Sequence, residues 1–335
     1  MNAASTKIWD KMSTMKSKSK NFYTGIILAI FLVTAAILQA CTTQTSETPQ
    51  AAEKALSWLL EEGDPQTGGY ESDSNSVEAL LAIGANNISA ADWRKNPDSA
   101  SLLDYWIENG AAFSLNGAAE AGKLAAGMSA SEGCWPEFAK QPLYFYDPST
   151  GIFDPEPGFQ AWAILGTLAL DQDVPDGAVE YLKSQVQPDG GWEWNAGFGS
   201  DTNTTTFVIQ TLLADGEPLD SPTIENGLKY LQAAQNDDGG FTYAPGSSFG
   251  TDSDSNSSAY AIQAILAVGQ DPQSDAWSKG GKNAIDYLLA LQLPDGSLEW
   301  QPGNGANFLA TAQAIPALLS KSFPFKIKAL PSCPD

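Results

Sequence analysis

Two kinds of segment alternate along this chain, and they differ in where their polar residues lie. In the first kind, apolar residues recur at spacings of three and four, whereas the second kind carries almost no charge. These patterns predict helices with one solvent-exposed face and helices that are buried on most sides. We expect helices near residues 52–62, 75–85, 99–109, 117–128, 158–170, 176–186, 203–214, 223–235, 256–268, 280–292 and 307–319. No run alternates strictly enough to predict a sheet core.

A turn recurs at the end of the amphipathic segments. In three copies an Asp lies eight residues after a Tyr and precedes a glycine: Tyr181 and Asp189, Tyr230 and Asp238, Tyr287 and Asp295. A weaker copy runs from Ala55 to Tyr70. Such self-similarity, at a period of about 50 residues, predicts stacked helical hairpins. Charged outer helices around low-charge inner helices indicate an all-α fold, an α/α toroid of about five or six hairpins.

The first 40 residues have the form of an export signal. Lys16, Lys18 and Lys20 precede an apolar segment that ends in Leu38-Gln39-Ala40-Cys41. This ending resembles a bacterial lipobox, which implies cleavage before Cys41, a lipid on its sulfur and an extracytoplasmic protein anchored to the bacterial cell membrane. A single uncleaved anchor is the alternative. We expect a signal peptide at 1–40, a flexible tether at 41–52, the toroid at 53–320 with an aromatic insertion at 130–157, and a tail at 321–335.

The composition limits the partners of the protein. The chain has 17 Lys and Arg against 40 Asp and Glu, a net charge of −23, which disfavours binding to nucleic acid. In an oxidising compartment Cys134 and Cys333 can either pair or remain free thiols. The aromatic insertion is interpreted either as a lid or as filling between hairpins. We expect no metal and no cofactor, and the sequence leaves the oligomeric state open.

The Asp-Gly-Gly turns resemble the glutamine–tryptophan repeats of the terpenoid cyclase and protein prenyltransferase superfamily. The residues that match best are Gly177-Ala178, Tyr181-Leu182, Gln185, Gly190 and Trp192, with Gln235 and Gln292 in later copies. The resemblance covers about residues 52–320 and implies the toroid. It does not by itself select an activity.

Each branch of that superfamily has its own residue signature. The acid motif of class II cyclases, Asp-x-Asp-Asp, is incomplete here, because the chain reads Asp252-Ser253-Asp254-Ser255. The prenyltransferase zinc site needs a His, and the sequence contains none. The resemblance to the cyclases therefore implies Asp254 as the acid, supported by Asp252 and Asp201, only if the chain is an enzyme.

Polar caps and the residues that follow them form a candidate site. Asp201, Asp254 and the residues beside them can cap helix N-termini, or can also form a polar rim around a central cavity. Below the caps, one helical face repeats an aromatic and an amide, which either line the cavity or pack against outer helices. The candidate ligand-binding residues are Trp162, Asp201, Asn203, Phe207, Gln210, Asp252, Asp254, Asn256, Tyr260, Gln263 and Gln313.

The sequence favours a lipid-anchored toroid that binds an apolar or amphipathic small molecule without catalysis. The resemblance suggests an isoprenoid-like or corrinoid-like ligand. A class II terpene cyclase of the squalene type is the enzymatic alternative, and a surface scaffold that contacts other proteins is a third.

Overall fold

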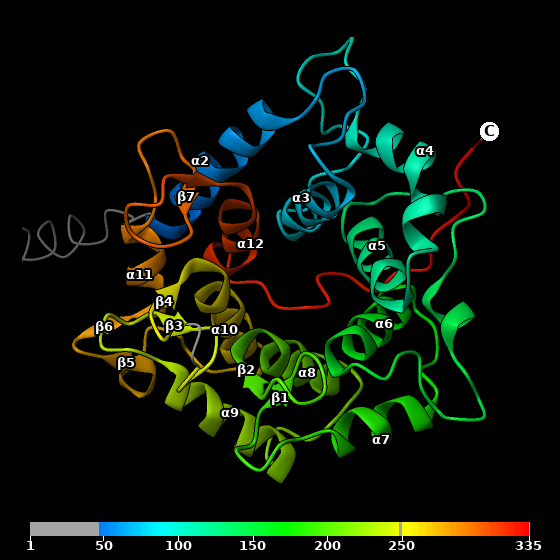
Figure 1. The fold of residues 1–335 in the computed structure, drawn as a ribbon. Coiled ribbons are helices and arrows are strands. Elements are labelled where there is room, and N and C mark those ends of the chain that lie inside the picture. Colours follow the sequence, from blue (N-terminus) through cyan, green and yellow to red (C-terminus); the bar gives the residue numbers. More distant parts are fainter. Residues whose placement is uncertain (1–46, 248–249, 335) are drawn as a thin grey trace, which may run out of the picture. The chain divides into compact units, whose positions relative to one another are not determined.

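Two concentric rings of helices make up the fold (Figure 1). The computed structural model describes residues 47–247 and 250–334. The inner ring contains α3 (Asp73–Ala85), α5 (Ala118–Ala130), α6 (Pro157–Ala169), α8 (Thr202–Ala214), α10 (Ser255–Ala267) and α12 (Phe308–Leu318). The outer ring contains α2 (Glu47–Glu62), α4 (Leu102–Ser114), α7 (Asp176–Ser184), α9 (Pro222–Ala234) and α11 (Ala284–Ala290). The predicted α/α toroid is confirmed.

The inner ring is closed. Each inner helix contacts the next one along the chain, and α12 contacts α3. The first and last hairpins also meet through side chains, since the rings of Tyr70 and Phe308 lie 4.9 Å apart. The Gln292 Nε2 donates to the Ala51 carbonyl at 2.8 Å. Within the described residues, closure leaves no terminal hairpin with an uncovered apolar face.

The recurring Gly turn holds neighbouring outer helices together. The Gln235 Nε2 donates to the Gly239 carbonyl of its own turn and to the Trp277 carbonyl of the next segment. Gly239 has a φ of +87°, and a Cβ there would lie 2.5 Å from the Asn283 carbonyl oxygen. Only glycine combines this backbone conformation with so close an approach. The repeat residues recognised in the sequence therefore position one hairpin against the next.

Short β-hairpins connect the turns to the next element. They are β1 (Trp192–Glu193) with β2 (Ser200–Asp201), β3 (Phe241–Thr242) with β4 (Ser253–Asp254), β5 (Ser278–Lys279) with β6 (Lys282–Asn283), and β7 (Leu298–Glu299) with β8 (Ala306–Asn307), all antiparallel. These hairpins could not be predicted from the sequence, because strands of two residues are too short to show alternation. In three of them a buried residue of the first strand pairs with the N-cap of an inner helix: Trp192 with Asp201, Phe241 with Asp254, and Leu298 with Asn307.

The aromatic insertion occupies an outer position between α5 and α6. It contains the 3₁₀ helix η1 (Pro142–Phe145), which contacts both of these inner helices. Trp135 and Phe153 are buried, whereas Phe138 is exposed. The segment thus fills the place of a missing outer helix.

The C-terminal segment crosses the ring from α12 toward α5 and α6 (Figure 1). The Phe323 amide donates to Gln210 Oε1 at 2.8 Å, and the Lys328 amide donates to the Ala169 carbonyl. Beyond these contacts, a disulfide joins Cys134 to Cys333. The segment is therefore fixed at both ends beneath the centre of the ring.

The predicted signal peptide and Cys41 lie outside the described residues. In the part of the chain that the structure describes, no helix is both long and apolar enough to cross a membrane.

Candidate functional site

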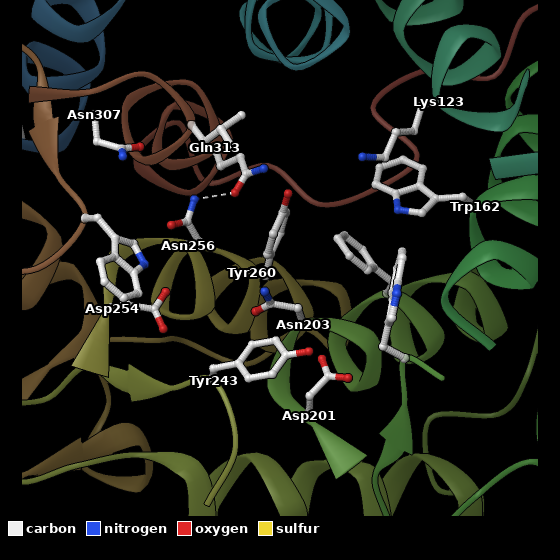
Figure 2. A pocket seen from close by; sticks show the side chains of 14 residues that line it. Lys123, Trp162, Asp201, Asn203, Tyr243, Asp254, Asn256, Tyr260, Asn307 and Gln313 are labelled. Atoms are coloured by element: carbon white, nitrogen blue, oxygen red, sulfur yellow. Dashed lines mark hydrogen bonds between the residues drawn. The ribbon is translucent and has the colours of Figure 1, made fainter. Parts of the chain in front are cut away.

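A cavity of about 550 Å³ lies at the N-terminal ends of the inner helices. Figure 2 shows aromatic rings and polar side chains facing it from several of these helices. Its lining consists of Lys123, Trp162, Trp194, Asp201, Asn203, Phe207, Tyr243, Asp254, Asn256, Tyr260, Trp300, Asn307, Leu309 and Gln313. The combination of a concave aromatic wall and a few directed polar groups is typical of small-molecule sites.

The structure brings eight of the eleven predicted ligand-binding residues to this cavity. They are Trp162, Asp201, Asn203, Phe207, Asp254, Asn256, Tyr260 and Gln313. The other three lie elsewhere: Asp252 is exposed, Gln210 binds the Phe323 amide, and Gln263 is fully buried outside the cavity lining. That any of the eight binds a ligand remains a prediction.

Asp201 caps α8 and presents one oxygen that is not engaged. Its Oδ1 accepts from the Thr204 amide at 2.7 Å, and its Oδ2 has no hydrogen-bond partner within the described residues. The side chain is buried, with 2% of the residue exposed. Burial raises the pKa of Asp201 to about 6, and the hydrogen bonds at the helix N-terminus act in the opposite direction. A proton is therefore available on this carboxyl in mildly acidic solution.

Asp254 caps the neighbouring helix α10 in the same way, but both of its oxygens are engaged. Its Oδ1 accepts from the Ser257 amide and its Oδ2 from the Ser257 hydroxyl, each at 2.8 Å. Burial raises the pKa of Asp254, and the hydrogen bonds from Ser257 oppose that rise. Both Asp residues thus act as ordinary caps and also stand at the cavity.

Aromatic residues from the following repeat stand beside each of these caps. The Thr202 amide donates to the Tyr243 carbonyl at 2.7 Å, and the Ser255 amide donates to the Trp300 carbonyl at 2.9 Å. In Figure 2 the Tyr243 ring lies next to Asp201. Burial and the negative charge of Asp201 raise the pKa of Tyr243 to about 12, so this hydroxyl stays protonated as a hydrogen-bond donor.

Sequence reasoning missed these rim aromatics, although a signal for them exists. Trp194, Tyr243 and Trp300 each lie two residues after the buried residue that closes a turn. On an extended chain, residues two apart lie on the same side of the backbone. Recognition of the hairpins would therefore have drawn attention to these three positions.

The wall of the cavity is a continuous row of aromatic rings. The ring centroids of Trp162 and Phe207 are 4.9 Å apart, and those of Phe207 and Tyr260 are 4.5 Å apart. Aromatic faces attract cations through their quadrupole, so this wall can stabilise positive charge as well as bind apolar chains.

Two polar pairs complete the lining. The Asn256 Nδ2 donates to Gln313 Oε1 at 2.5 Å, which connects α10 to α12. The Lys123 Nζ lies 3.0 Å from Glu78 Oε1 and 5.1 Å from the centroid of the Trp162 ring. Lys123 was not predicted, although a lone Lys in the small-residue helix α5 could have suggested it.

Comparisons with known proteins concern both the sequence and the fold of this chain. Residues 27–328 match the squalene-hopene cyclase C-terminal domain family. A drimenyl diphosphate synthase of Streptantibioticus cattleyicolor is 33% identical over 141 residues, which make up 38% of this chain and 24% of that protein. The chain thus spans about a quarter of the length of this curated relative.

Solved structures share the fold at low sequence identity. The type II terpene cyclase MstE from Scytonema superposes with a TM-score of 0.54 at 16% identity, covering 81% of this chain and 97% of that one. A glycosyl hydrolase family 88 structure from Bacteroides vulgatus gives a TM-score of 0.53 at 11% identity, covering 82% and 97%. These likenesses concern the fold alone, since the same double ring carries unrelated chemistries.

Proposed function

The chain belongs to the squalene-hopene cyclase C-terminal domain family, and from this premise we propose that its cavity binds an isoprenoid chain and starts its cyclisation by donating a proton. One observation carries the proposal: a buried carboxyl with a free oxygen, that of Asp201, lines a cavity walled by aromatic rings. It is the enzymatic alternative predicted from the sequence, with Asp201 in place of Asp254 as the acid. The family and the terpene cyclase relatives support it over a binding protein without catalysis.

Asp201 is the better candidate for the proton donor. A donor needs a neutral carboxyl whose hydroxyl can reach the substrate, and its conjugate base must be stabilised after the transfer. Asp201 offers the free Oδ2, while the Thr204 amide and the positive end of the α8 dipole stabilise the carboxylate that results. Asp254, which the sequence suggested, has both oxygens held by Ser257.

The proposed reaction is an isomerisation. The π electrons of one double bond form a carbon–hydrogen bond with the proton of Asp201. This leaves a carbocation on the other carbon of that double bond. The π electrons of the next double bond then form a carbon–carbon bond, and the positive charge moves along the chain past the aromatic wall. Loss of a proton from the last cation to water forms the final double bond, and Asp201 regains its proton from solvent.

A carrier without catalysis is the second candidate. The observation that favours it is the incomplete acid motif, in which Ser255 stands in the third acidic place and Asp252 lies outside the cavity lining. A carrier would retain its ligand unchanged.

The test is to incubate the full-length protein with squalene and with geranylgeraniol and to analyse the extracts by gas chromatography and mass spectrometry. We expect cyclised isomers from the wild type and from Asp220→Asn, which alters an exposed acid away from the cavity lining, but at least a hundredfold less from Asp201→Asn. Equal product from Asp201→Asn would reject Asp201 as the acid. Native mass spectra with bound, unreacted isoprenoid and no product would favour the carrier.

We also propose that the mature chain is exported and attached to the bacterial cell membrane by a lipid on Cys41. The support is the lipobox-like segment that ends at Cys41. Metabolic labelling with a palmitate analogue should mark the wild type and not Cys41→Ala. Equal labelling of both would reject the anchor.

A further inference from the structure

One residue of the C-terminal segment packs against the aromatic wall of the cavity. The Phe323 ring centroid lies 5.1 Å from that of Trp162 and 6.4 Å from that of Phe207, and both of these rings line the cavity. Phe323 itself is buried and lies outside the cavity lining. Its ring therefore supports the wall from the side that faces away from the cavity.

The main chain of Phe323 shows how deep in the ring this contact lies. The Phe323 amide donates to Gln210 Oε1 at 2.8 Å. Gln210 lies three residues, about one turn, after Phe207 on α8. Because the cavity lies at the N-terminal ends of the inner helices, Phe323 stands beyond Phe207, at the inner end of the cavity.

The C-terminal segment fixes Phe323 on both sides as it crosses the ring (Figure 1). Before it, the Lys321 amide donates to the Pro316 carbonyl of α12 at 2.9 Å. After it, the Phe325 ring stacks on the Phe323 ring, with centroids 4.3 Å apart. A ring that is already held in one position can support its neighbours at little further cost in conformational entropy.

The size of the side chain at this position should therefore control the depth of the cavity. Removal of a buried ring leaves a space that the surrounding side chains fill only in part. At Phe323 this space would open directly behind Trp162 and Phe207, so that a ligand could push their rings into it. A larger side chain would instead press these rings toward the cavity.

From this arrangement we infer that Phe323 forms the floor of the cavity and determines how long an isoprenoid chain the site accepts. It is a specificity-determining residue that acts through Trp162 and Phe207. The inference rests on the proposed function, because it specifies the substrate of the same cavity. It also gives the C-terminal segment a role in the site.

The test is a competition between farnesol and geranylgeraniol, added in equal amounts to the full-length protein and measured by native mass spectrometry. The ratio of the two bound alcohols does not depend on how much of the protein is folded. Relative to the wild type, Phe323→Ala should shift this ratio about fivefold toward the longer geranylgeraniol. Phe323→Trp should shift it about threefold toward the shorter farnesol.

Phe113→Ala is the matched control. Phe113 is a buried residue of the outer helix α4, and its ring lies 5.1 Å from that of Trp106, outside the cavity lining. Its removal should lower the melting temperature about as much as Phe323→Ala does, since each variant removes a buried ring beside a tryptophan. The ratio of bound alcohols should stay within about twofold of the wild type. A shift as large as that of Phe323→Ala would reject the inference.

The direction of the two shifts separates a floor from a merely structural residue. An unchanged ratio in both Phe323 variants, or a shift in the same direction in both, would overturn the inference and leave the proposed function standing. If Phe323→Ala does not fold, Phe323→Leu takes its place, with a smaller shift expected in the same direction. A wild type that binds neither alcohol would overturn the proposed function, and this inference with it.

Discussion

Asp201 and Asp254 occupy equivalent N-cap positions on the neighbouring helices α8 and α10, but only Asp254 accepts a hydroxyl hydrogen bond. The residue three positions after each cap makes the difference. The Ser257 hydroxyl donates to Asp254 Oδ2, whereas the Thr204 hydroxyl and Asp201 Oδ2 both lack partners in the described part of the chain. The Ser257 hydroxyl thus opposes the rise in pKa that burial gives Asp254, whereas Asp201 Oδ2 remains available to a ligand.

Asp201→Asn should flatten the pH dependence of stability. Asp201 has a pKa of about 6 in the folded protein and an ordinary value of 3.8, so the folded state holds the proton more tightly. The stabilisation from this group is therefore present at low pH and is lost as the pH rises through about 6. Asn caps a helix about as well as Asp. Between about pH 4 and about pH 7, the wild type should lose up to about 3 kcal/mol of unfolding free energy relative to the variant.

Urea unfolding at several pH values measures this difference, with Asp252→Asn as the control for loss of an exposed acid. Parallel pH curves for the wild type and Asp201→Asn would mean that Asp201 has an ordinary pKa.

Cys333→Ser should destabilise the protein by releasing the C-terminal segment. The disulfide joins residues 199 positions apart, and closing so long a loop restricts the unfolded chain strongly. We expect a loss on the order of 4 kcal/mol in urea unfolding. Reductant should produce the same loss in the wild type and no further loss in the variant. A variant as stable as the oxidised wild type would contradict this role of the disulfide.

Gly122→Ala should push α5 away from α6. A Cβ at Gly122 would lie 2.1 Å from the Trp162 carbonyl oxygen, which belongs to the backbone and cannot turn aside. Overpacking of this kind costs about 1 to 3 kcal/mol or more. Because Trp162 lines the cavity, isoprenoid binding should weaken as well.

Thermal unfolding measures the loss of stability in Gly122→Ala. A titration with geranylgeraniol, followed by tryptophan fluorescence, measures the loss of binding. Gly63→Ala is the control, since its added Cβ would make only ordinary contacts, the nearest at 3.4 Å. Equal melting temperatures for the two variants would show that the contact between α5 and α6 tolerates a methyl group.

The helices and the closed ring could be predicted because the glycine turn and the polar helix cap that follows it recur along the chain at similar spacing. One error concerns α11, which was expected at 280–292 and spans Ala284–Ala290. The hairpin of β5 and β6 takes up the residues before it, and Asn283 caps the helix. A pattern of apolar residues alone does not separate such a hairpin from the first turn of a helix.

The site could be predicted only in part, because its depth depends on the tertiary structure. Phe207 and Tyr260 lie four residues, about one helical turn, after Asn203 and Asn256, and they do line the cavity. Gln210 and Gln263 share that face one turn further along, below the cavity lining, where the Phe323 amide occupies Gln210. Lys123 was missed because the rotation of α5 about its axis, which decides the face turned to the hollow, is fixed by packing against α6.

Solvent deuterium incorporation tests the central claim most directly. Full-length protein incubated with geranylgeraniol in D₂O should yield a cyclised isomer that carries one added carbon-bound deuterium, since the initiating proton on Asp201 exchanges with solvent. Asp201→Asn should yield none while still binding the alcohol. A wild type that binds the alcohol and returns it uncyclised and without carbon-bound deuterium would contradict the account.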